Sequence, residues 1–152
     1  MRKTLSIDAV RSEHGSSLVE AAIFIPVLLT LLLGIVDFGR AYYQGNEVAA
    51  AAHAGAIYGS QNPSDISGME AVADDNAPDV PGIASTAVWG CECSDGSAAS
   101  ASCATAPSCS GTTDVYYVQV TSSATYSPLV PWPTFNSSFK MSSTVEMRSS
   151  LN

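Results

Sequence analysis

A glycine and a glutamate lie five residues apart at the start of the longest apolar run, in Gly15-Ser16-Ser17-Leu18-Val19-Glu20. A carboxylate costs about 2.5 to 3.5 kcal/mol at the centre of a membrane span, and less near its edge. Glu20 could therefore lie near an edge and reach the lipid headgroups. Alternatively, a cut after Gly15 would place a new α-amine on Ser16. With an ordinary pKa of about 7.7 to 8, that amine would be a cationic partner for Glu20, on the same or a neighbouring subunit.

Four cysteines form the second group of reactive side chains: Cys91, Cys93, Cys103 and Cys109. The residues around them are mostly Ser, Ala, Gly and Thr, which offer little apolar surface for a core. Disulfides would stabilise such a stretch by about 2 to 4 kcal/mol each. Zinc is less favoured because the spacing lacks the paired C-x2-C units typical of structural zinc sites. We predict two disulfides. Of the three possible pairings, the one that joins Cys91 to Cys93 is least favoured, because so short a loop strains the bridge.

Other chemistry is poorly supported by the sequence. No common catalytic or nucleotide-binding motif is present, and the two histidines, His14 and His53, fall in a polar N-terminal segment and on the polar side of a helix. The acidic turn that contains Asp74, Asp75 and Asp79 lacks the spacing of a calcium loop. The net charge of −8, with no cluster of Lys and Arg after Arg11, argues against a nucleic-acid partner. We expect no enzyme activity, no metal and no cofactor.

The glutamate and glycine flank a segment that can cross a bilayer. From Leu18 to Val36 the chain is apolar except for Glu20 and Thr30, and a helix of this length spans about 28 Å, close to a bilayer core. Residues 1–15 form a basic leader with three cations, whereas only Arg40 follows the span closely. This bias predicts a cytoplasmic N-terminus and an exported head, which suits disulfides.

The rest of the chain predicts an α+β fold, in which a long N-terminal transmembrane helix precedes a small antiparallel sheet in a disulfide-stabilised extracytoplasmic head. We expect three regions: the leader (1–15), the transmembrane and extended helix (16–59) and the head (60–152). Within the head, the pattern predicts a short helix over 67–76 and strands over 83–89, 115–126 and 139–147. A row of residues at helical spacing, here called the stripe, predicts which face of the extended helix is packed. Most of these residues are small, and small residues allow close approach at interfaces between membrane helices. The stripe contains Phe38, Tyr42, Gly45, Ala49, Ala52 and Ala56.

The N-terminal pattern resembles the type IV pilin superfamily, in which a prepilin peptidase cuts after a glycine and the fifth mature residue is glutamate. More narrowly, it resembles the TadE-like pseudopilins. The matching residues are Glu20, Pro26, Gly34 and the step Asp37-Phe38-Gly39-Arg40, followed by an alanine-rich helix. The resemblance extends to the end strands, VYYVQVTSSATYSPLVPWP and STVEMRS.

The resemblance implies a minor pseudopilin or assembly component of a Tad (tight adherence, Flp-type) pilus or secretion apparatus. Such a chain would be a single-pass protein of the bacterial inner membrane, with its head in the periplasm or outside the cell. Its partners would be the lipid bilayer, the prepilin peptidase that cuts between Gly15 and Ser16, and other pilin and pseudopilin subunits. The alternative is an uncleaved membrane-anchored binding module without a pilus role.

Overall fold

A computed structural model of the chain describes residues 14–105, 107–130 and 138–149. Its elements are α1 (His14–Gln61), α2 (Ile66–Asp75), β1 (Ala84–Cys93), β2 (Ala99–Ser100), η1 (Cys103–Thr105), β3 (Asp114–Tyr126) and β4 (Phe139–Arg148). The chain divides into two units, Met1–Val36 and Asp37–Asn152, and the boundary falls inside α1. The predicted α+β fold, with a long apolar helix and a small antiparallel sheet, is confirmed.

The first unit contributes the apolar part of α1. Its large side chains from Leu18 to Val36 are all exposed, between 44% and 71% of their surface. Within the described residues, α1 is the one helix long and apolar enough to cross a membrane. Pro26 lies inside it, and the Thr30 hydroxyl donates a hydrogen bond of 2.8 Å to the Pro26 carbonyl, which keeps this polar group paired within the helix. Most of the predicted leader, residues 1–13, lies outside the described residues.

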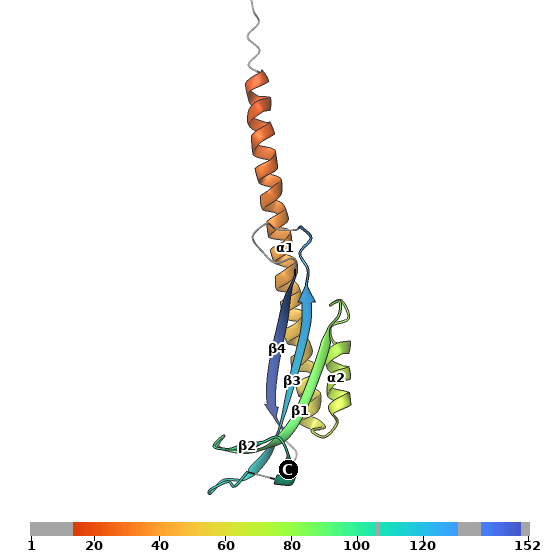
Figure 1. Cartoon of the computed structure of the whole chain (residues 1–152), viewed down its shortest axis with the longest axis vertical. Helices are drawn as coiled ribbons and strands as arrows, with labels where there is room; N and C mark the ends of the chain where they lie inside the picture. The colour runs from red at the N-terminus through yellow and green to blue at the C-terminus, as the bar shows by residue number, and fades with distance from the viewer. Residues whose placement is uncertain (1–13, 106, 131–137, 150–152) are drawn as a thin grey trace, which may run out of the picture. The chain divides into compact units, whose positions relative to one another are not determined.

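The second unit is built on a four-stranded antiparallel sheet in the order β2-β1-β3-β4. β3 is an inner strand that pairs with β1 and β4, and the alternation of its side chains explains the two faces of the sheet. Val118, Val120 and Ala124 point toward the helices and are buried. On the opposite face, the hydroxyls of Thr121 and Thr144 are 2.8 Å apart, and this face is polar. Figure 1 shows the sheet with α2 alongside β1.

The core lies between this sheet and two helix faces. α2 contributes Met69 and Ala73, and the second half of α1 contributes small residues, which are Ala51, Ala52, Gly55, Ala56 and Gly59. A Cβ atom at Gly55 would lie 2.8 Å from the main-chain oxygen of Met69, too close for any side chain to be accommodated without movement. The small residues of α1 therefore allow close packing against the protein's own α2 and sheet.

The prediction that the whole stripe forms the packed face of α1 is wrong in part. Ala52 and Ala56 are buried as expected, but Phe38 and Tyr42 are 75% and 67% exposed. The buried face of α1 instead begins with Asp37 and continues through Val48. Large aromatic residues at helical spacing suggested a buried face, yet the sheet approaches the side on which small residues leave room.

Two acidic side chains make specific polar contacts, one at the N-terminus of α2 and one in its middle. At its N-terminus Asp65 caps the helix, because its carboxylate accepts a hydrogen bond of 2.9 Å from the Gly68 N–H and one of 2.7 Å from the Tyr58 hydroxyl. One turn further, Glu70 Oε1 accepts a bond of 3.1 Å from the Ala87 N–H on β1. This bond occupies a donor on the outer edge of β1, which would otherwise be open to another strand.

We predict that replacing Asp65 by asparagine lowers the melting temperature at neutral pH. The hydrogen bond from Tyr58, followed by those from Gly68 and Ser67, holds the pKa of the Asp65 carboxyl below its ordinary value of 3.8. Its stabilising contribution is therefore complete above that ordinary value, and it is lost as the pH falls through the lower pKa of the folded state. Thermal unfolding of the full chain in detergent at pH 7, 5 and 3 should show a difference from wild type that shrinks on acidification. Asp114→Asn, at an exposed position, is the control.

The strand predictions differ from the structure mainly around the cysteines. β3 and β4 lie within one residue of the predicted ranges, and α2 is shifted by one residue. β1 extends through Cys93, beyond the predicted end at residue 89, and β2 was predicted to be loop. The pairing of Cys91 with Ser100 shows that β2 is defined by its contact with β1.

Candidate functional site

The sequence-predicted processing site lies at the start of α1. The main chain of Gly15 and Ser16 is helical, and Glu20 follows on the exposed surface of the same helix. The side chains around Glu20 on this surface are mostly apolar; they are Ser17, Ala21, Ile23, Phe24 and Val27. A carboxylate in this setting requires a polar partner if the surface is covered by lipid or by other helices.

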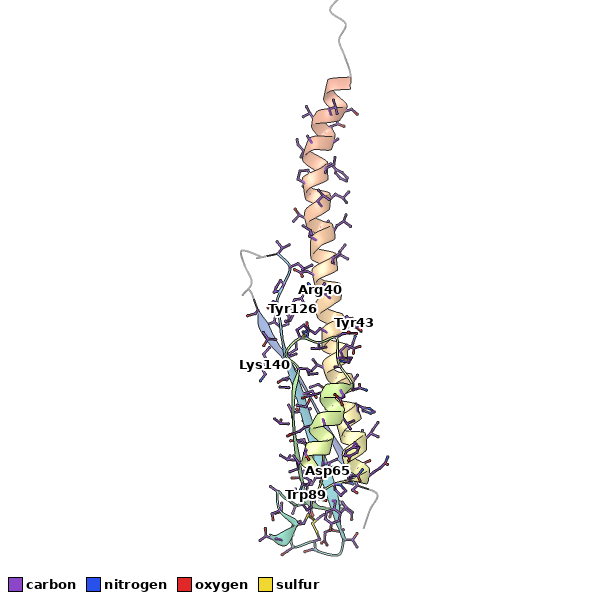
Figure 2. The ribbon with its side chains drawn as sticks, turned by 90° about the vertical axis from the view of Figure 1, so that its right-hand side faces the viewer. Arg40, Tyr43, Asp65, Trp89, Tyr126 and Lys140 are labelled. Atoms are coloured by element: carbon purple, nitrogen blue, oxygen red, sulfur yellow. A yellow bond between two sulfur atoms is a disulfide. The ribbon has the colours of Figure 1, made fainter. Side chains whose placement is uncertain are left out.

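A second polar feature begins at Asp37, directly after the apolar segment. Asp37 is buried, and the Tyr126 hydroxyl at the end of β3 lies 2.8 Å from both its main-chain oxygen and its Oδ1 atom. The Leu129 N–H donates a further bond of 2.9 Å to Oδ1. Arg40 lies 3.8 Å from the same oxygen and 5.8 Å from the centre of the Tyr126 ring. We call these four residues the Asp37 junction; Figure 2 shows Arg40 and Tyr126 close together.

The protonation state of Tyr126 in the Asp37 junction suits a structural contact. Burial, and then the hydrogen bond to Asp37, raise the pKa of the Tyr126 phenol, so the hydroxyl remains a donor at neutral pH. The contact joins residues 89 positions apart and fixes the end of β3 to the helix. In the sequence, Asp37 was noted only through the resemblance and Arg40 also through the charge bias across the span, whereas the contacts of Tyr126 and Leu129 were not predicted. A tyrosine at the end of an aromatic strand and an acid at the end of an apolar run were the available signals.

The disulfides lie at the other end of the sheet. Cys91 pairs with Cys103 and Cys93 with Cys109, which confirms the predicted two disulfides and supplies the pairing. Beside them, Arg148 donates a bond of 2.6 Å to the buried Glu92 carboxylate. Cys93 lies opposite Asp114 at the start of β3. Asp114 is twelve residues from Tyr126, which is a distance of about 40 Å along the strand.

We predict that reducing both disulfides lowers the free energy of unfolding of the head by about 2 to 4 kcal/mol for each bridge. Membrane insertion should be unchanged, because the apolar helix lies outside both disulfide loops. Intact mass with and without reduction before alkylation measures the bridges, and denaturant unfolding measures the stability. Four free thiols in exported protein would contradict the prediction.

The remaining polar candidates are dispersed. His53 is exposed on α1, and the side chain of His14 is outside the described residues. Asp75 and Asp79 are exposed near the end of α2. In the parts of the chain that the structure describes, no three His, Cys, Asp or Glu side chains gather in a way that could hold a metal ion.

One helix that is long and apolar enough to cross a membrane, followed by a small α+β head, suggests a single-pass membrane protein. The family model described as TadE-like protein matches residues 15–56, so the resemblance to the TadE-like family is confirmed over this segment. The matched segment contains Glu20, Asp37 and Arg40. It ends before α2, and the similarity of the end strands stays a prediction. No curated protein and no solved structure matches the chain.

Proposed function

We propose that the chain is a pseudopilin or assembly component of a Tad/Flp-type pilus or secretion apparatus, made as a membrane precursor and cut after Gly15 by a prepilin peptidase. The observation that carries the proposal is the TadE-like match, which begins at Gly15 and includes Glu20. The cut would leave Ser16 as the new N-terminus, four residues before the exposed Glu20 carboxylate. Other pilin and pseudopilin subunits are the proposed partners, and the role is structural rather than catalytic.

We further propose that the N-terminus is cytoplasmic and that the head lies on the outer side of the bacterial inner membrane. The three basic residues that precede the span support this orientation. The two disulfides support an oxidising compartment for the head.

One feature bears on the alternative, an uncut anchor with an external binding module. The main chain between Gly15 and Ser16 is already helical, so this first turn must open before a peptidase can bind the bond in an extended form. Helix ends open at little cost in free energy, and the barrier is therefore small.

N-terminal analysis of the protein purified from its native host tests the proposal. The proposed function requires a mature chain that starts at Ser16, whereas the uncut anchor retains residues 1–15. A chain found only with its leader would contradict the pseudopilin role.

Labelling of the reduced cysteines in intact cells with a membrane-impermeant reagent tests the orientation. Labelling seen only after lysis would contradict the orientation.

A further inference from the structure

The exposed apolar side chains of the second unit gather at one of its ends. In the described residues from Asp37 onward, eight large apolar side chains are exposed. Five of them lie at the end that carries Asp37, and they are Phe38, Tyr42, Tyr43, Leu129 and Phe139. Isolated exposed apolar residues are normal, but a concentration at one end of a small domain indicates a contact surface.

Chain connectivity and side-chain contacts place three of these residues at the level of Asp37. Phe38 is its neighbour in the chain, and Leu129 donates its N–H to the Asp37 carboxylate. The Phe139 ring lies 5.3 Å from the Tyr126 ring, whose hydroxyl contacts Asp37. Tyr42 follows five residues later on α1, about 8 Å further along the helix. The exposed residues at this end therefore come from three parts of the unit, which are α1, the chain that follows β3, and the start of β4.

Two of the three basic residues of the second unit lie at the same end, and the third, Arg148, is paired with Glu92 beside the disulfides. Arg40 forms an ion pair of 3.8 Å with Asp37, and its side chain is still 49% exposed next to Tyr126. Lys140 is exposed and lies opposite Thr125, one residue before Tyr126. The eleven acids of the unit outnumber its three bases, and two of those three bases lie at this end. Figure 2 shows Arg40 and Tyr126 toward this end, and Asp65 and Trp89 toward the other.

We propose that this end of the head is a lipid-binding collar, formed by Phe38, Tyr42, Leu129 and Phe139 together with Arg40 and Lys140. The collar lies in the headgroup layer of the bilayer that α1 crosses. Its aromatic and aliphatic side chains contact the outer part of the acyl chains, and its two cations bind anionic lipid phosphates.

Continuity with the membrane span identifies lipid as the occupant. Asp37 is joined by one peptide bond to Val36, the last residue of the apolar run, so the collar begins where the hydrocarbon core ends. The headgroup layer is about 5 to 8 Å thick on each side, which accommodates the rise from Asp37 to Tyr42. The Asp37 carboxylate, which lipid phosphates would repel, is buried in hydrogen bonds. The collar depends on the membrane helix and not on any role in a pilus.

Tryptophan reporters in the full chain test the proposal. Leu129→Trp and the conservative Tyr42→Trp place a reporter in the collar, and Val88→Trp places one at a 50% exposed position on the polar face of the sheet. Each variant is reconstituted into vesicles of phosphatidylcholine and phosphatidylglycerol, with acyl chains brominated or not. Trp89 and Trp132 contribute the same background to all three variants.

We expect brominated lipid to quench the added fluorescence at positions 129 and 42 by about twofold and to leave that at position 88 nearly unchanged. Lys140→Gln should reduce the quenching at position 129 in anionic vesicles but not in vesicles of phosphatidylcholine alone. Equal quenching at all three positions would overturn the proposal. Protection of positions 129 and 42 that increases with the protein-to-lipid ratio would also overturn it, because a second copy would then cover the collar.

Discussion

Replacing Glu20 by alanine is expected to reduce assembled pili or secretion in the native host at least about tenfold, while insertion and cleavage continue. Two unit charges 4 Å apart are worth about 4 kcal/mol at an effective dielectric constant near 20, and the substitution removes one of them. The efficiency of membrane insertion should not fall, because the substitution removes a polar group that is costly in hydrocarbon. Glu20→Asp retains the charge and is the matched control. Normal assembly by the alanine variant would contradict the role of Glu20 as a charge partner.

Gly15→Leu is expected to block cleavage of the leader, which Glu20→Ala leaves intact. A branched side chain next to the scissile bond should block the peptidase, whereas Gly15→Ala is a small change and should be tolerated. The uncut precursor still inserts, since the apolar run after Glu20 is unchanged. The mass of the membrane-bound chain distinguishes the two variants. If the leucine variant is still cut before Ser16, the proposed recognition of the glycine is wrong.

Replacing Tyr126 by phenylalanine should lower the free energy of unfolding of the head by about 1.5 to 3 kcal/mol, because the buried Asp37 carboxylate loses a hydrogen-bond donor. Adding Asp37→Asn to this variant should restore part of the loss, since a neutral amide costs less to bury than a charge. Denaturant unfolding of the full chain in detergent provides the measurement. Tyr42→Phe makes the same chemical change at an exposed position and should have little effect. Additive effects of the two substitutions would argue against coupling between Tyr126 and Asp37.

Local pattern was sufficient to predict most of the elements. Alternation of β-branched and aromatic residues located β3 and β4, and an apolar run interrupted only by Glu20 and Thr30 located the candidate membrane helix. β2 could not be predicted in this way, because Ala99 and Ser100 have no strand preference. They pair with β1 where the Cys91–Cys103 bridge returns the chain to its edge.

Long-range contacts were beyond the same reasoning. Nothing in the spacing of the four cysteines selects the observed pairing, which depends on how β1 and the following loop are folded together. The contact between Asp37 and Tyr126 joins distant segments and depends on the register of the whole sheet against α1. The face of α1 that packs on the sheet was predicted only in part. Ala52 and Ala56 are buried as expected, but the pattern cannot tell an aromatic side chain that faces the core from an exposed one such as Phe38.

The loop between β1 and β3 lies about 40 Å from the Asp37 junction, measured along β3. Its turns contain Gly96 and Gly111 in the left-handed region, with φ of 74° and 78°, and no side-chain atom lies near Gly111. Chain inserted beside Gly111 would meet no core packing and would leave both bridges with their present partners. This position is therefore a permissive site for an epitope tag, through which an antibody could count or pull on single molecules in living cells without touching the anchored end.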